Sequence, residues 1–370
     1  MSFIFDNVIF SLQKGGGVSL YWFEMFKRMC RDGYQLSAIE YPGAMSNIFR
    51  SKMSVSPGIV SEIKGLPVSL LRYLPCSISP GRRRLFLSSY YRLPADRSLP
   101  SVMTVYDFTY EKYRKGFPRF VHSLQKKKAV AAASAIICIS ENSKRDLMEF
   151  CPEIPADRIS VIYLGVSEAY RPIKGQSVNL MGPHWKDAPY VLFVGGRHSY
   201  KNFDLAVRAV SKVPGFLLVS AGGGPLSCVE SDMVGKELPG RHMHFPSLRD
   251  EDLNILYNKA HAFLYPSSYE GFGLPVLESM AAGCPVIAVS SSSIPEVAGD
   301  AAILTDKPDP VSFADAIVRL TDATLRAEYI SKGFARVQLF SWEKCYRETL
   351  AVYIRVMRKH NVPVEYVRDR

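Results

Sequence analysis

The sequence predicts an α/β protein of two doubly wound domains with parallel sheets. With 370 residues, 47% hydrophobic and 22% charged, the chain is typical of a globular protein too long for one core. Short apolar segments of strand length alternate with amphipathic segments of helix length. Residues 171–188 contain Pro and Gly with little periodicity, which indicates a linker between two such series. We therefore expect domains at 1–170 and 189–345, followed by 346–370.

The first domain begins with a predicted strand at Phe3–Phe10, a glycine-rich turn and a helix that ends near Gly33. A strand, a turn and a helix in this order present backbone N–H groups to phosphate. The three glycines at 15–17 do not fit the G-x-G-x-x-G dinucleotide fingerprint, so a plain tight turn stays an alternative.

Later parts of the first domain are less regular. Residues 42–100 are interrupted by Pro, Gly and Ser, so we expect them to be irregular and partly mobile. Apolar runs predict further strands at Leu85–Ser88, Val102–Val105, Ala135–Ser140 and Ile159–Tyr163.

The second domain restarts with a predicted strand at Tyr190–Val194. Arg197 and Lys201 follow on the turn into a helix, where a planar guanidinium and an ammonium suit phosphate oxygens. Further strands are predicted at Phe216–Ala221, Ala262–Tyr265 and Pro285–Val289.

The most informative stretch, YPSSYEGFGLPVLESMAAGCPVIAV, covers residues 265–289. Pro275 suits the first turn of a helix and Gly283 the position just past its end, which predicts a helix at Pro275–Ala282. Glu278 then lies on this helix, and Glu270 lies in the preceding glycine-containing loop, where ligands approach the backbone. The residues alone leave open that Glu278 is merely exposed and that the glycines only shape a turn.

The segment PSSYEGFGLPVLESMAAGCPVIA resembles the E-x7-E motif of retaining nucleotide-sugar glycosyltransferases of the GT-B fold, family four. This resemblance implies two Rossmann-like domains that face each other across a cleft, with residues 346–370 crossing back to the first. It implies that Glu270 contacts the donor sugar and Glu278 the ribose. The donor-binding residues it implies are Gly16, Gly17, Arg197, Lys201, Phe245, Glu270, Gly271, Phe272, Gly273, Leu274 and Glu278.

The resemblance also implies a catalytic set of Glu270, Arg197, Lys201 and Asp107. Asp107 matches the family and would bind a sugar hydroxyl or hold its loop, although a simple turn cap stays open. Relatives often carry His where this chain has Tyr106, which puts a His-based role in doubt. No zinc-type Cys/His spacing and no D-x-D stands out. We therefore expect no metal and no cofactor, with fixed cations stabilising the leaving diphosphate.

The net charge of +11 lies wholly in the first half, because residues 1–175 hold 25 Lys+Arg against 14 Asp+Glu and residues 176–370 hold 21 of each. Such asymmetry suits an anionic partner, which we expect to be an anionic membrane surface. Seven basic residues between Lys112 and Lys128, interleaved with Tyr113, Phe117 and Phe120, predict a mobile basic loop running into a helix. A solvated face that only aids solubility is the alternative.

No apolar run reaches the roughly 20 residues that span a bilayer, the start lacks the features of a signal peptide, and seven cysteines are scattered. We expect a cytoplasmic protein, peripheral on the inner face of the membrane. The expected activity is retaining transfer of a sugar to a glycan or lipid-linked acceptor in bacterial surface polysaccharide synthesis. The segment IFSLQKGGG resembles O-antigen-type transferases, which favours mannose or a deoxysugar from a GDP-linked donor. A GT-B sugar-nucleotide epimerase, a non-catalytic partner subunit and a nucleic-acid-binding protein are the rival hypotheses.

Overall fold

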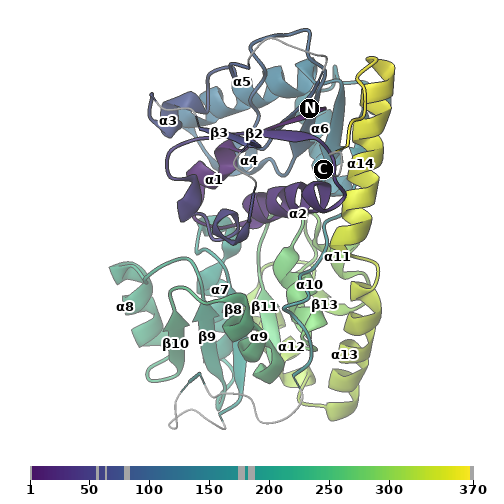
Figure 1. The fold of residues 1–370 in the computed structure, drawn as a ribbon. Helices are drawn as coiled ribbons and strands as arrows, with labels where there is room; N and C mark the ends of the chain where they lie inside the picture. The colour runs from purple at the N-terminus through teal and green to yellow at the C-terminus, as the bar shows by residue number, and fades with distance from the viewer. Residues whose placement is uncertain are drawn as a thin grey trace. The chain divides into compact units, whose positions relative to one another are not determined.

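The computed structural model describes residues 2–55, 58–62, 65–78, 84–173, 180–181 and 188–366. The chain forms two compact units, which Figure 1 shows as a ribbon. The first unit comprises Met1–Leu164 together with Trp342–Arg370, and the second comprises Gly165–Ser341. Most of the predicted linker, residues 174–179 and 182–187, lies outside the described residues.

The first unit contains a parallel sheet with the strand order β3-β2-β1-β4-β5-β6-β7 among its described residues. Its register is fixed by pairs such as Phe3 with Leu36 and Phe3 with Leu85. The strands are β1 (Phe3–Asp6), β2 (Leu36–Glu40), β3 (Val60–Glu62), β4 (Leu85–Ser88), β5 (Ser101–Val105), β6 (Ala135–Cys138) and β7 (Ile159–Val161).

The helices of the first unit connect these strands, and the last one comes from the end of the chain. They are α1 (Val8–Leu12), α2 (Gly17–Arg31), α3 (Val68–Leu71), α4 (Thr109–Tyr113), α5 (Gly116–Ala132), α6 (Glu141–Phe150) and α14 (Trp342–Lys359). Short 3₁₀ turns lie at Ala44–Ser46, Arg50–Lys52 and Ala156–Arg158. Helix α14 lies beside α2 and contacts β4 and β6, so residues far apart in sequence share this unit's core (Figure 1).

The second unit contains a parallel sheet with the described strand order β10-β9-β8-β11-β12-β13. The strands are β8 (Tyr190–Val194), β9 (Leu217–Ala221), β10 (His242–Phe245), β11 (Ala262–Tyr265), β12 (Val286–Val289) and β13 (Ala302–Thr305). The helices are α7 (Phe203–Ser211), α8 (Cys228–Glu237), α9 (Asp250–Lys259), α10 (Leu274–Ala281), α11 (Ile294–Ala298), α12 (Pro310–Arg319) and α13 (Ala323–Val337), with a 3₁₀ turn at Ser199–Lys201. Both sheets pair only in parallel among the described residues, which confirms the predicted fold class.

Burial explains why the strands read as continuous apolar runs. Strands β8, β9, β11 and β12 are buried along nearly their whole length, as expected for a parallel sheet covered on both faces. Helices α7 and α12 pack together on this sheet and contribute Phe203, Val207, Phe313 and Ile317 to its core. Because a parallel sheet places ligand sites at the carboxyl ends of its strands, this packing fixes the edge on which a site can form.

Two predictions about the first unit are wrong. The segment Phe3–Phe10 is not one strand, because β1 ends at Asp6 and Val8–Leu12 form α1. The helix predicted at the end of the segment from Lys112 to Lys128 is present as α5, but the residues before it are not a long loop, because Thr109–Tyr113 form α4; Lys126 is buried. No helix among the described residues is long and apolar enough to cross a bilayer.

Candidate functional site

The predicted donor-binding residues of the second unit gather at the carboxyl edge of its sheet. Arg197 and Lys201 follow β8, Phe245 ends β10, and Glu270 follows β11. Helix α10 begins at the same edge, so the positive end of its dipole lies where these loops meet. One edge of one sheet therefore collects two cations, a carboxylate and a helix N-terminus.

Lys201 and Glu270 form the central contact of this edge. The Lys201 Nζ donates to Glu270 Oε1 at 2.5 Å, and both side chains are largely buried, with 16% and 12% of their surface exposed. The ammonium also lies 5.5 Å from the ring centre of Tyr265, whose hydroxyl bonds Glu270. An ammonium has three N–H donors, so Lys201 can hold Glu270 and still donate to a second anion.

The backbone around Glu270 is fixed by two serines from the loop after β12. The N–H of Glu270 donates to Ser292 Oγ at 2.8 Å, and Ser293 Oγ donates to the carbonyls of Glu270 and Phe272, both at 2.9 Å. Ser292 adopts a left-handed backbone with φ of 50°. Glu270 is thus held at its side chain by one loop and at its backbone by another, which preorganises its carboxylate.

Asn202 joins the β8 loop to the β11 loop. Its side-chain amide donates to the carbonyl of Pro266 and to Ser268 Oγ, both at 2.7 Å. The N–H of Ser268 in turn donates to the carbonyl of Tyr200 at 2.8 Å. These bonds keep Lys201 and Glu270 together although 69 residues separate them in sequence.

Glu278 lies on α10 and is half-buried, not on an exposed face. Burial and, to a smaller extent, the nearby charge of Asp250 raise the pKa of its carboxyl to about 8, against the opposing effect of a hydrogen bond with Tyr257. The Tyr257 hydroxyl donates to Glu278 Oε2 at 3.4 Å. A carboxyl in this setting gains from ligand hydroxyls that donate to it, because they replace the water it has lost.

Arg197 has internal partners that the sequence does not reveal. Its guanidinium donates to Glu230 Oε1 at 2.9 Å and to the carbonyl oxygens of Gly222, Gly223, Gly224 and Pro225 at 2.7–3.3 Å. Only 5% of the side chain is exposed. Arg197 therefore holds the glycine turn after β9, and its contact with a diphosphate stays a prediction.

The glycine turn itself requires glycine. Gly222, Gly223 and Gly224 all have positive φ, and a Cβ on Gly223 would lie 3.0 Å from the carbonyl oxygen of Gly195 and 2.7 Å from Arg197 Nη1. His244 fixes the far side of the turn, because its Nε2 lies 2.8 Å from the carbonyl oxygen of Gly224. That carbonyl can only accept, so Nε2 donates to it, and Nδ1 lies 2.8 Å from Ser220 Oγ.

The remaining predicted residues around the motif shape the entry to α10. Gly271 and Phe272 precede the helix, Gly273 is its N-cap with φ of 107°, and Leu274 is its first residue. Phe272 is buried and meets Phe340 edge to face, with ring centres 6.0 Å apart. Phe245 accepts from the N–H of Gly222 at 2.8 Å through its carbonyl oxygen.

Gly16, Gly17, Tyr106 and Asp107 belong to the first unit. Gly16 is the N-cap of α2 and Gly17 its first residue. Asp107 Oδ1 accepts from the N–H of Thr109 at 2.9 Å, which is the turn cap that the sequence left open. Tyr106 is buried against the ring of Tyr21. A role of Asp107 in sugar binding stays a prediction.

Sequence reasoning missed Glu230, Asn202 and the serines at 292 and 293. Glu230 had a recognisable signal, because Ser227 and Glu230 have the S-x-x-E spacing of a capping box and form one at the start of α8. The other three had no local signal, since their partners lie in distant loops. Among the described residues, no group of three or more His, Cys, Asp and Glu is placed to hold a metal ion.

The chain has two Rossmann-like units, and the second carries the site at the carboxyl edge of its sheet. This is the architecture of the GT-B class. The sequence matches the family model "Glycosyl transferases group 1" over residues 182–336 and "Glycosyltransferase Family 4" over residues 15–170. The chain therefore belongs to the family-four glycosyltransferases of the GT-B fold.

Curated relatives match part of the chain. O-antigen chain mannosyltransferase B of Escherichia coli is 31% identical over 234 residues, which is 60% of this chain and 61% of the relative. D-inositol 3-phosphate glycosyltransferase of Acidothermus cellulolyticus is 31% identical over 244 residues, 60% of this chain and 54% of the relative. The match thus spans little more than half of the length of these relatives.

Solved structures share the fold at low identity. Sucrose-phosphate synthase from Thermosynechococcus elongatus has a TM-score of 0.76 at 19% identity and covers 97% of this chain and all of its own. The Anabaena protein HepE in complex with UDP-glucose has a TM-score of 0.71 at 16% identity, with 96% and 100% coverage. These likenesses show the fold.

Proposed function

We propose that this protein is a retaining glycosyltransferase that moves a sugar from a nucleoside diphosphate donor to a glycan or lipid-linked acceptor. The observation that carries the proposal is the Lys201–Glu270 pair at the carboxyl edge of the second sheet, beside the start of α10. The relatives support it, because one is an O-antigen mannosyltransferase and one structural neighbour is a complex with UDP-glucose. We propose that the donor is a GDP-linked mannose or deoxysugar and that the transfer belongs to the synthesis of a bacterial surface polysaccharide.

The donor diphosphate would lie between Lys201 and the N-terminus of α10. Cleavage of the sugar–phosphate bond moves negative charge onto the diphosphate, and a fixed ammonium and the positive end of the helix dipole stabilise that charge. Lys201 is already oriented by Glu270, so little reorganisation accompanies the reaction. We propose that this chain needs no metal for that step, because these groups supply positive potential where the charge develops.

Glu270 and Glu278 would divide the recognition of the donor. Glu270, fixed by Ser292 and Ser293, would accept hydrogen bonds from sugar hydroxyls and position the sugar. Glu278 would accept from the ribose hydroxyls. Retention would follow front-face attack, in which the departing phosphate takes the acceptor proton.

A panel of nucleoside diphosphates and nucleotide-sugars, scored by thermal shift, tests this proposal. A ligand present at about 100 times its dissociation constant stabilises the fold by about 2.7 kcal/mol. We expect a guanosine or other nucleoside diphosphate and its sugar conjugate to raise the melting temperature. If no member of the panel does so, the proposal is wrong. Release of an epimerised nucleotide-sugar in place of a transferred sugar would assign the protein to the epimerases.

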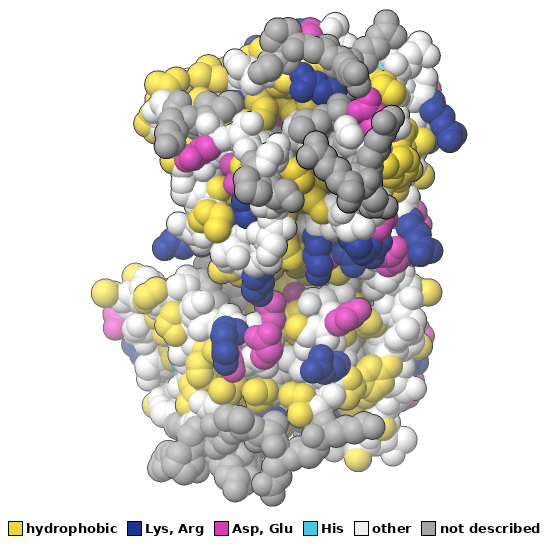
Figure 2. All heavy atoms as spheres, in the orientation of Figure 1, with side chains coloured by type: hydrophobic (Ala, Val, Ile, Leu, Met, Phe, Trp, Pro, Cys, Tyr) yellow, Lys and Arg dark blue, Asp and Glu magenta, His cyan; other side chains and the backbone are white. Residues whose placement is uncertain are grey.

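We also propose that the first unit associates with an anionic membrane surface. Helix α5 carries the exposed rings of Phe117 and Phe120, at 76% and 64% exposure, next to exposed Lys115 and Lys128. Hydrophobic side chains also gather over α3, where Leu66, Leu70, Tyr73 and Leu74 are exposed (Figure 2). Basic residues beside exposed apolar ones suit an anionic lipid surface, since each Lys or Arg near such a surface contributes about 1 kcal/mol of attraction.

Lys126 is unsuitable for a variant that tests this association, because it is buried. Lys126 donates to Glu111 and to the carbonyl of Asp107, so its replacement would damage the fold. We therefore choose Lys115→Glu/Lys128→Glu, with Lys52→Glu/Lys359→Glu as a control of equal charge change at exposed sites. Sedimentation with anionic liposomes at low salt should be lost in the first variant, retained in the control and lost at high salt. Equal sedimentation with neutral liposomes would refute the charge-based association.

A further inference from the structure

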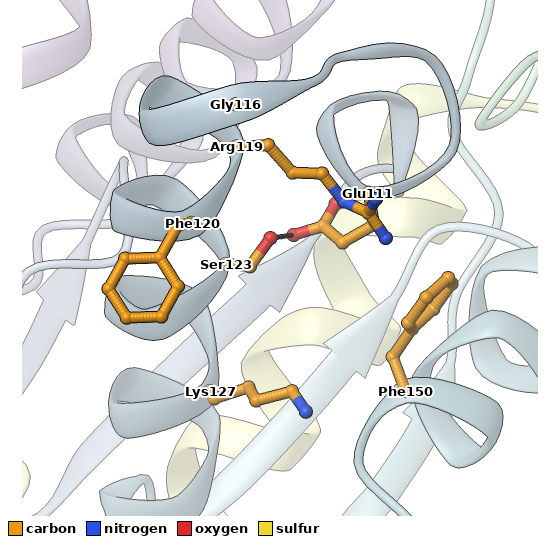
Figure 3. Close-up of a pocket in the computed structure, with 7 residues that line it drawn as sticks. All are labelled: Glu111, Gly116, Arg119, Phe120, Ser123, Lys127 and Phe150. Atoms are coloured by element: carbon orange, nitrogen blue, oxygen red, sulfur yellow. Dashed lines mark hydrogen bonds between the residues drawn. The ribbon is translucent and has the colours of Figure 1, made fainter.

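A cavity in the first unit lies between α5 and the end of α6. It has a volume of about 390 Å³ and is lined by Glu111, Gly116, Arg119, Phe120, Ser123, Lys127 and Phe150 (Figure 3). This volume falls within the range of small-ligand sites, which is roughly 300–1,000 Å³. None of its residues belongs to the proposed donor site.

Two cations of this cavity are not neutralised. Arg119 and Lys127 are exposed, and neither takes part in an ion pair among the described residues. They lie eight residues apart on α5, about 12 Å along the helix axis. Both long side chains extend to the same side of α5 (Figure 3), so they flank a common space.

The carboxylate on the floor of the cavity does not cancel these charges. Glu111 Oε2 accepts from Lys126 Nζ at 2.8 Å, and Oε1 accepts from Ser123 Oγ at 3.0 Å. Burial opposes ionisation of Glu111, but the nearby His122, whose Nδ1 lies 3.6 Å from Oε1, and the hydrogen bond and charge of Lys126 outweigh it and lower its pKa to about 2. Glu111 is therefore ionised and neutralised by buried Lys126, so Arg119 and Lys127 leave the cavity with a net positive charge.

Two aromatic rings line the cavity: Phe150 lies across the space into which Arg119 and Lys127 extend, whereas the Phe120 ring projects to the other side of α5 (Figure 3). Phe150 is stacked on Phe108 with ring centres 5.2 Å apart, which fixes this wall of the cavity. Phe120 lines the cavity although 64% of its surface is exposed, and exposed Phe117 lies one turn away on the same helix. Positive groups next to apolar rings match a ligand in which a phosphate is attached to an apolar chain.

We propose that this cavity binds a phosphate ester of an apolar chain, with Arg119 and Lys127 on the phosphate and Phe150 against the first carbons of the chain. The role that we assign to the cavity, which is to hold the phosphate end of a lipid-linked acceptor, rests on the proposed function. The chemistry itself is independent of the donor site.

Isothermal titration of the full-length protein with hexyl phosphate, inorganic phosphate and 1-hexanol tests this assignment. We expect hexyl phosphate to bind at least tenfold more tightly than either of the other two. The variant Arg119→Gln/Lys127→Gln should bind it at least tenfold more weakly. The control Lys52→Gln/Lys359→Gln removes the same charge from exposed sites of the same unit and should bind it as the unaltered protein does.

Three results would overturn the inference: no binding of hexyl phosphate, equal binding by Arg119→Gln/Lys127→Gln, or equal affinity for inorganic phosphate and hexyl phosphate. The last would leave a simple anion site without chain recognition. Titration of the same samples with the nucleoside diphosphate identified by thermal shift separates this inference from the proposed function. Nucleotide binding without hexyl phosphate binding defeats only the cavity, and the reverse defeats only the donor site.

Discussion

Replacement of Glu278 by Gln should change how the stability of the protein depends on pH. Burial raises the pKa of Glu278 to about 8 from an ordinary value of 4.5. Between these values the folded protein holds a proton that the unfolded chain has released, so the free energy of unfolding falls as pH rises. Gln cannot lose a proton, and Glu278→Gln should therefore lack this decline.

The size of the effect follows from the shift. Each pKa unit corresponds to about 1.4 kcal/mol, so from pH 5 to pH 7.5 the upper limit is about 3 kcal/mol. Glu278 is half-buried, and solvent screening reduces the expected difference to about 1–3 kcal/mol. Urea unfolding of both proteins at pH 5, 6, 7 and 8 measures it. Parallel pH profiles for the unaltered protein and the Glu278→Gln variant would refute the reasoning.

Binding of a nucleotide should release the proton of Glu278. At pH 7 a carboxyl with a pKa near 8 is about nine-tenths protonated, so a nucleotide that binds only the ionised form releases close to one proton. Titration calorimetry in two buffers with different ionisation enthalpies counts that proton. Proton release that persists unchanged in Glu278→Gln would mean that another group titrates.

Two further predictions concern the loops of the donor site. Lys201→Ala should lower the rate of sugar transfer by about one to two decades with the fold intact, because a charge-assisted hydrogen bond contributes roughly 1.5–3 kcal/mol. The control Lys212→Ala, at an exposed site, should have no effect. Equal transfer rates in the two variants would show that Lys201 takes no part in the mechanism. Gly223→Ala should destabilise the fold by about 1–3 kcal/mol in thermal unfolding, because Gly223 has a positive φ and the carbonyl of Gly195 lies close to it. The control Gly235→Ala within α8, where nothing lies within 4 Å, should be neutral or stabilising. If Gly235→Ala were the more destabilising change, the observed turn would be contradicted.

The second half of the fold could be predicted closely because its buried strands are bounded by Gly and Pro. The bounds of Tyr190–Val194 and Ala262–Tyr265 agree with the structure, and the helix after Gly273 begins one residue before its predicted start. The prediction of one strand at Phe3–Phe10 was wrong because a short, nearly continuous apolar run does not distinguish a strand from a buried helix. Tertiary packing decides such cases.

The site was predictable in its members but not in its contacts. Lys201 and Glu270 each have a local signal, yet their contact depends on Asn202 joining two loops. The partners of Arg197 were not predictable, because Glu230 and the glycine turn lie 25 or more residues further along the chain. Lys126 could not be separated from its basic neighbours, because its burial depends on a pairing with Glu111.

Hydrogen–deuterium exchange of the full-length protein, with and without its nucleotide-sugar, tests the central claim most directly. The account predicts that the donor slows exchange at the carboxyl edge of the second sheet, in residues 195–202, 222–225 and 266–274. It predicts that Lys201→Ala, at the same donor concentration, loses much of this protection. Protection confined to other segments, with these three unchanged at saturating donor, would contradict the account.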